Sequence, residues 1–123
     1  MEMRQEGEAK NKFRNTLKIA VHDKDGIRII DFDKIIYCKA EGNYTIIYFA
    51  DRNILLTKVL KQVESFLPDN VFLRIHKSYL ININAVTEFK QNTIILGPDI
   101  KLPISRRRKA KVLKKIKEKL LFI

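Results

Sequence analysis

Residues 71–104 read VFLRIHKSYLININAVTEFKQNTIILGPDIKLPI, and this stretch decides the fold class. It holds five short runs rich in Ile, Leu, Val and Phe, at residues 71–75, 80–83, 86–89, 93–96 and 100–104. Two of the breaks, Gln91-Asn92 and Gly97-Pro-Asp99, have the composition of hairpin turns. Because the breaks have hairpin length, the stretch predicts antiparallel strands and not βαβ units.

Further strands are expected on the amino-terminal side of this stretch. Runs rich in Ile, Val, Tyr and Phe occupy residues 17–22, 27–32, 35–40, 44–50 and 53–57, and turn residues separate them at 23–26, 41–43 and 51–53. Between the two groups of strands, the apolar residues of 59–67 recur with helical spacing, and Pro68 ends this predicted helix.

The sequence after Ser105 changes to a helical period. Leu113, Ile116 and Leu120 lie at positions i, i+3 and i+7, while Lys and Arg fill most of the other positions. We expect a basic amphipathic helix with Ser105 as its N-cap. The whole pattern predicts a mostly β domain of about ten short antiparallel strands, with one short helix in mid-chain and a basic helix at the C-terminal end.

The length and charge of the chain indicate how many domains it has and what kind of partner it binds. Its 123 residues fit one domain, placed at residues 16–123 after a linker or disordered segment at residues 1–15. Without a bilayer-spanning apolar run or a signal peptide, a cytoplasmic protein is expected. The net charge is +11, of which residues 101–119 supply +9 through ten basic side chains and one acid. This concentrated field predicts a polyanionic partner, nucleic acid before an anionic membrane.

The residues that could support metal or catalytic chemistry do not form a credible site. One cysteine, Cys38, and two histidines are too few for a structural zinc site. The acidic turn at residues 23–26 fails as a calcium loop, because neither end of such a loop would hold a carboxylate. Cys38 shares a strand face with Ile36 and Ala40, so we expect a buried, unreactive thiol. No enzyme activity, metal, cofactor or small-molecule substrate is expected.

Two clusters of hydrogen-bond donors are candidate contacts for an anion. Ser105-Arg-Arg-Arg-Lys109 places four cations at a helix start, where they repel one another and the helix dipole unless an anion binds. The alternative is an ordinary solvated basic face. Arg74-Ile-His-Lys-Ser-Tyr79 gathers cations, an imidazole and hydroxyl groups at a strand end, where they could bind phosphate or guanine. Its alternative is a strand edge that lysine protects from aggregation.

Together with Ala40-Glu-Gly-Asn-Tyr44, the motifs at 72–82 (FLRIHKSYLIN) and 102–108 (LPISRRR) resemble, in order and spacing, the LytTR (LytR/AlgR-type) family of bacterial DNA-binding domains. The resemblance covers about residues 16–120. It implies an elongated, mostly antiparallel domain whose loops enter the DNA grooves. The base-contacting positions that it implies are Asn43, Tyr44, Lys77 and Arg106. The phosphate-contacting positions are His76, Ser78, Arg107 and Arg108.

The function expected from this resemblance is sequence-specific binding of double-stranded DNA by a transcriptional regulator or response-regulator output domain of a two-component system. Two copies are expected on a direct-repeat site, and the upstream receiver or sensor domain that such regulators carry is not expected within this chain. Two alternatives remain open at this stage. One is an RNA-binding module, which would need exposed aromatic rings. The other is a membrane or protein contact through the apolar side of the basic helix, namely Leu113, Ile116, Leu120, Leu121 and Phe122.

Overall fold

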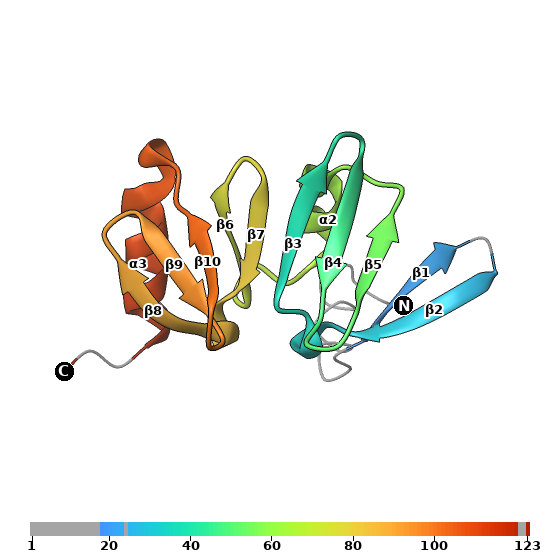
Figure 1. The fold of residues 1–123 in the computed structure, drawn as a ribbon, viewed down its shortest axis with the longest axis horizontal. Coiled ribbons are helices and arrows are strands. Elements are labelled where there is room, and N and C mark those ends of the chain that lie inside the picture. Colours follow the sequence, from blue (N-terminus) through green and yellow to red (C-terminus); the bar gives the residue numbers. More distant parts are fainter. Residues whose placement is uncertain (1–17, 24, 121–122) are drawn as a thin grey trace, which may run out of the picture. The chain divides into compact units, whose positions relative to one another are not determined.

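The computed structural model describes residues 18–23, 25–120 and 123, and Figure 1 shows their fold. The predicted linker at residues 1–15 lies outside the described residues. The chain divides into two compact units, Met1–Lys34 and Ile35–Ile123, and each is described by itself. In the first unit, strand β1 (Lys18–Asp23) pairs antiparallel with β2 (Gly26–Asp31), and a 3₁₀ turn at Phe32–Lys34 follows. Asp23 pairs with Gly26, so β1 and β2 form a hairpin, as predicted.

The second unit contains a five-stranded antiparallel sheet in the order β5-β4-β3-β7-β6. Its strands are β3 (Tyr37–Glu41), β4 (Tyr44–Tyr48), β5 (Asn53–Leu56), β6 (Phe72–His76) and β7 (Tyr79–Asn82). Helix α2 (Leu60–Phe66) packs on β3, β4 and β7 and buries Leu60 and Val63. Alternate residues of the central strands, such as Cys38, Ile47 and Leu80, are fully buried.

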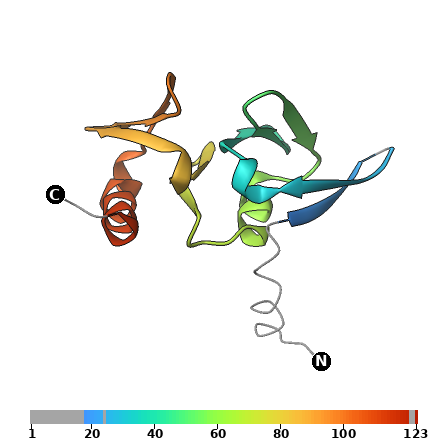
Figure 2. The same ribbon diagram turned by 90° about the horizontal axis from the view of Figure 1, so that it is seen from below.

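The same unit contains a three-stranded antiparallel sheet in the order β10-β9-β8. Its strands are β8 (Val86–Lys90), β9 (Thr93–Leu96) and β10 (Ile100–Pro103), and helix α3 (Lys109–Lys119) follows them. One apolar core joins this sheet, α3 and the strands β6 and β7. Its buried members are Leu73, Ile75, Ile81, Ile83, Ile94, Leu96, Leu102, Ile104, Val112 and Ile116. In Figure 2, α2 and α3 lie on the same side of the strands.

Two buried polar side chains join segments that are distant in the sequence. Asn82, the last residue of β7, donates from Nδ2 to the carbonyl oxygen of Ile35 at 2.9 Å and accepts from the N–H of Asn84 at 2.9 Å. Thr45 donates to the carbonyl oxygen of Lys58 at 2.7 Å. Because an unpaired buried polar group costs about 1–3 kcal/mol, these bonds are needed to hold the ends of the five-stranded sheet. Asn82 of the HKSYLIN motif is thus a structural residue.

The predicted fold class is confirmed, since the structure has ten strands at the predicted places, with bounds that differ by no more than two residues. The basic helix differs from expectation in two respects. Residues Arg106–Arg108 form a separate 3₁₀ turn, so α3 begins at Lys109, and Ser105 makes no side-chain capping bond. The sequence gives no sign of this turn, because a single 3₁₀ turn and the first turn of an α-helix favour the same residue types.

The apolar face of α3 also differs from the predicted one. Its buried residues are Val112 and Ile116, one helical turn apart, whereas Leu113 is half-buried and Leu120 is 48% exposed. The helix is rotated in this way because its buried side packs on β6 and enters the apolar core that β6 shares with the three-stranded sheet. Leu121 and Phe122 lie outside the described residues. No helix among residues 18–23, 25–120 and 123 is long and apolar enough to cross a membrane.

Cys38 is fully buried in β3, as predicted, and burial raises the pKa of its thiol to about 12. Only the thiolate is a strong nucleophile, so the folded protein should react with a thiol reagent far more slowly at pH 8 than the protein unfolded in urea. Cys38→Ala should leave DNA affinity unchanged within about twofold, because the variant removes one buried sulfur atom and no exposed donor. Rapid labelling of the folded protein with loss of DNA binding would instead show an exposed, functional thiol.

Candidate nucleic-acid interface

The eight predicted DNA-contacting residues lie in three segments of the second unit. These segments are the β3–β4 turn, the β6–β7 turn and the connection from β10 to α3, and all three lie along the upper edge of the unit in Figure 1. We call this edge, with its eight residues, the loop edge. Its members are Asn43, Tyr44, His76, Lys77, Ser78, Arg106, Arg107 and Arg108.

Two backbone hydrogen bonds connect the three segments of the loop edge. The N–H of Ala40, near the end of β3, donates to the carbonyl oxygen of Ser78 at 2.9 Å. The N–H of Ser105 donates to the carbonyl oxygen of Ile75 at 2.9 Å. Strand β6 has a register irregularity between Arg74 and His76, which takes Ile75 out of regular pairing with β7. The β6–β7 turn is therefore the central segment, bonded to a neighbour on each side.

The β3–β4 turn is a tight hairpin that exposes its polar residues. Glu41 pairs with Tyr44, so Gly42 and Asn43 are the two central residues. Gly42 has a φ of +60°, which favours glycine at this position. Asn43 is exposed, and Tyr44 is 46% exposed, so both side chains are accessible to a large ligand.

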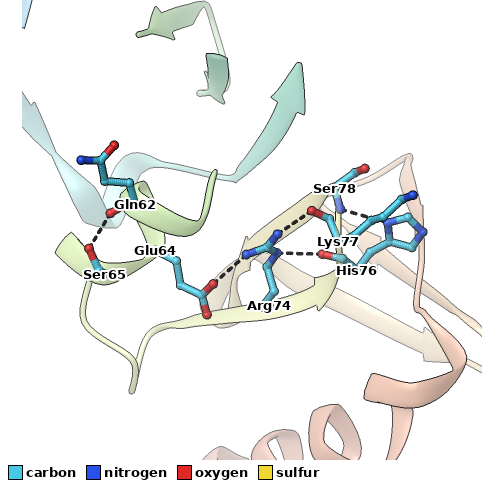
Figure 3. Close-up of polar contacts among 7 residues, drawn as sticks. All are labelled: Gln62, Glu64, Ser65, Arg74, His76, Lys77 and Ser78. Atoms are coloured by element: carbon cyan, nitrogen blue, oxygen red, sulfur yellow. Dashed lines mark hydrogen bonds and ion pairs between the residues drawn. The ribbon is translucent and has the colours of Figure 1, made fainter. Parts of the chain in front are cut away.

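The β6–β7 turn is held from inside by Arg74, as Figure 3 shows. The guanidinium donates from Nε to the carbonyl oxygen of His76 at 2.8 Å and from Nη2 to the carbonyl oxygen of Lys77. Its Nη1 forms an ion pair with Oε1 of Glu64, on helix α2, at 2.8 Å. The N–H of Ser78 donates to Nδ1 of His76 at 3.1 Å. The Lys77 side chain itself is exposed.

The third segment presents a run of guanidinium groups. Arg106 and Arg107 are exposed, and Arg108 is half-buried. The pKa of Arg108 is lowered, first by burial and then by repulsion from Arg107 and Arg74. Attraction by Glu64 offsets only part of this decrease. These electrostatic neighbours show that the arginine turn and the β6–β7 turn share one positive field. Such a field, concentrated at one edge, favours an anionic ligand.

The β8–β9 hairpin, which was not predicted to be part of the site, also contacts the connection from β10 to α3. The β8–β9 turn accepts a bond from the N–H of Ile104 to the Asn92 carbonyl oxygen at 2.8 Å, and Lys109 donates from Nζ to Asn92 Oδ1 at 3.0 Å. These bonds fix the start of α3 next to the hairpin. Asn92 was expected in a hairpin turn but not beside the arginine turn. Glu64 was not among the predicted site residues, because no local pattern connects a helix residue with Arg74 ten positions later.

The tyrosines of the five-stranded sheet pack on each other. The rings of Tyr37 and Tyr48 stack with centroids 4.5 Å apart, and Tyr79 lies 6.3 Å from Tyr37 and 5.4 Å from His76. A module that binds single-stranded RNA needs ring faces that are free to stack on bases. The stacking covers one face of Tyr37 and one face of Tyr48, so this pair has less ring surface free for bases than separate rings would have.

The charge state of His76 is expected to depend on DNA. Burial lowers the pKa of His76 from 6.5, and Lys77, Arg108 and Arg74 lower it further by repulsion. DNA phosphates would weaken that repulsion, so DNA binding should raise the pKa and take up protons. Affinity should therefore increase as the pH falls through the interval between the two values. NMR titration of the imidazole, with and without duplex DNA, measures the pKa of His76 in the bound and the free protein. His76→Gln should lose the pH dependence of DNA affinity that comes from the imidazole. An equal pKa of His76 with and without DNA would instead place it away from the phosphates.

Comparison with known proteins identifies what the chain is similar to. The sequence profile of a family described as "LytTr DNA-binding domain" matches residues 25–117. Sensory transduction protein LytT of Bacillus subtilis (strain 168) is 30% identical over 104 residues, which are 80% of this chain and 43% of that protein. Heme-containing CO-sensing transcriptional regulator RcoM 2 of Paraburkholderia xenovorans (strain LB400) is 29% identical over 105 residues, which are 80% of this chain and 39% of that protein. The chain thus spans less than half the length of these relatives.

A solved structure shows the same fold. It is described as the LytTr DNA-binding domain of a putative methyl-accepting/DNA response regulator from Bacillus cereus. It superposes with a TM-score of 0.69 at 20% identity and covers 81% of this chain and 96% of its own. The region that matches the family, residues 25–117, contains all eight residues of the loop edge.

Proposed function

The chain belongs to the LytTr DNA-binding domain family, and on that premise we propose that the loop edge recognises a specific sequence of duplex DNA. In this proposal the turns enter the grooves and α3 supplies basic side chains to the backbone. The base contacts come from Asn43, Tyr44, Lys77 and Arg106. The phosphate contacts come from His76, Ser78, Arg107 and Arg108.

The observation that supports this proposal best is the connection of three exposed, donor-bearing segments by backbone bonds. Ser78 and Ile75, on either side of the β6–β7 turn, accept bonds from the two neighbouring segments. A rigid spacing matters because base recognition requires donors that match the positions of acceptors along a groove. The side chains that project from these segments are amide, ammonium and guanidinium groups, which are the usual donors to base edges and phosphates.

The wider context is also part of the proposal. The chain serves as the output domain of a bacterial transcriptional regulator in the cytoplasm, and two copies bind the two halves of a direct repeat. The relatives that it matches are named as sensory transduction proteins and as a transcriptional regulator, and they are more than twice as long as the matched region. A receiver or sensor domain on the same polypeptide or a partner would then control it. The domain is proposed to act by binding and not by catalysis.

The direct test is selection of bound sequences from a random duplex library. The expected result is enrichment of a short motif that occurs twice in the same orientation. Titration with the enriched duplex and with a shuffled duplex of equal length then gives the specificity ratio, which is the affinity for the first divided by the affinity for the second. Recovery of unenriched sequences, with a ratio near one, would contradict sequence-specific binding.

A further inference from the structure

We infer that the ion pair of Glu64 with Arg74 positions the β6–β7 turn and thereby determines how well Lys77 discriminates between DNA sequences. This inference rests on the proposed function. It concerns two residues with no assigned role in DNA binding, one of them on a helix outside the loop edge. Both act through the turn and not by contact with the DNA.

The guanidinium of Arg74 is fully engaged inside the protein. Its side chain is only 16% exposed, and each of its three nitrogens has a partner within the protein. A guanidinium that binds two carbonyl oxygens and a carboxylate has a fixed orientation, because its donors lie in one plane. Arg74 is therefore unsuited to bind a phosphate, in contrast to the exposed Lys77 next to it.

The β6–β7 turn depends on Arg74 for its conformation. The register irregularity in β6 interrupts the regular pairing just before the turn, so the ladder holds the turn less closely there. Arg74 donates to the carbonyl oxygens of His76, the last residue of β6, and Lys77, the first residue of the turn. Because the Lys77 backbone is held at its carbonyl, the direction in which its side chain leaves the turn is held as well.

The negative charge of Glu64 also indicates a positioning role. A carboxylate beside a surface that binds a polyanion opposes binding by Coulomb repulsion. Glu64 is 41% exposed, and it attracts both Arg74 and Arg108. An acid in this place is unfavourable for attraction to DNA in general. Its contribution is then to fix the two arginines, and through Arg74 the conformation of the turn.

Glu64→Gln tests the inference, because it is expected to change the affinities for the two duplexes in opposite directions. Removal of the negative charge should leave affinity for a shuffled duplex equal or higher. Loss of the ion pair leaves Arg74 at most a weaker hydrogen bond to a neutral side chain at this position, which should lower affinity for the selected duplex. The specificity ratio should fall about threefold to tenfold, within the range of energies that couple neighbouring residues. Glu118→Gln is the matched control, since Glu118 is an exposed acid on α3 and should change both affinities by the same factor. Equal behaviour of the two variants would overturn the inference.

A double-mutant cycle with Arg74→Lys and Lys77→Ala tests the path of the effect. Lysine keeps the positive charge but cannot bridge two carbonyl oxygens and a carboxylate in one plane. Arg74→Lys should lower the specificity ratio in the wild-type background and have no further effect in the Lys77→Ala background. Additive losses would overturn the inference. The midpoint of urea unfolding, measured for every variant, identifies any variant that binds less because it is unfolded. Glu64→Gln changes a half-exposed side chain, so it still tests the inference if Arg74→Lys does not fold.

The wild-type measurements separate this inference from the proposed function. If the wild-type protein shows no specificity ratio above one, the proposed function itself fails. If the wild-type protein discriminates while Glu64→Gln and Arg74→Lys keep its full ratio, only the positioning role fails.

Discussion

Affinity for duplex DNA is expected to fall by a factor of about 10² to 10⁴ when the salt concentration is raised from about 50 to 200 mM. If about 4–7 phosphates are neutralised, the logarithm of the binding constant should fall with the logarithm of salt with a slope of about −0.9 per contact. The net charge of +11 and the concentration of that charge in residues 101–119 make this the largest expected effect. Fluorescence anisotropy with a labelled duplex measures the slope.

The control for the salt effect uses single lysines of α3. Lys114→Ala should make the slope less steep by about one phosphate contact, because the exposed Lys114 lies on the basic helix. Lys61→Ala, at an exposed position on α2, should leave the slope unchanged. Affinity that is independent of salt over this range would contradict an interface built on phosphate contacts.

Arg106→Ala is expected to lower affinity for the selected duplex about 5- to 150-fold, corresponding to about 1–3 kcal/mol, and to lower affinity for a shuffled duplex much less. The reason is that an arginine presented by a turn can bind O6 and N7 of guanine with two parallel hydrogen bonds. Arg106 is exposed in the 3₁₀ turn that precedes α3. Electrophoretic mobility shifts or anisotropy with both duplexes give the two affinities.

The matched control for Arg106 is its neighbour Arg107, which has the same side chain in the same turn. Arg107→Ala should weaken the selected and shuffled duplexes by similar, smaller factors, as expected for a phosphate contact. If Arg106→Ala also weakened both duplexes equally, Arg106 would be a phosphate contact. Base recognition would then have to come from Asn43, Tyr44 and Lys77.

The sequence by itself was sufficient to predict the strands and the antiparallel pairing of strands that short turns connect, but not the pairing of β3 with β7. Strands of four to six residues with two- or three-residue turns, such as Gln91-Asn92 and Gly97-Pro-Asp99, leave no room for any other connection. Burial of Cys38 was predictable for the same reason, because alternation along a strand decides which side chains face the core. The DNA contacts that the family motifs imply stay predictions.

Only the tertiary structure decided which of these polar residues support the others. Arg74 and Lys77 are both cations of one motif, yet Arg74 is held by Glu64 and two carbonyl oxygens while Lys77 is exposed. Likewise, the helix that follows Ser105 buries Val112 instead of Leu120, because its rotation is set by the sheet against which it packs. Local periodicity specifies the element and its approximate apolar side, whereas partners that lie far apart in the sequence specify orientation and contacts.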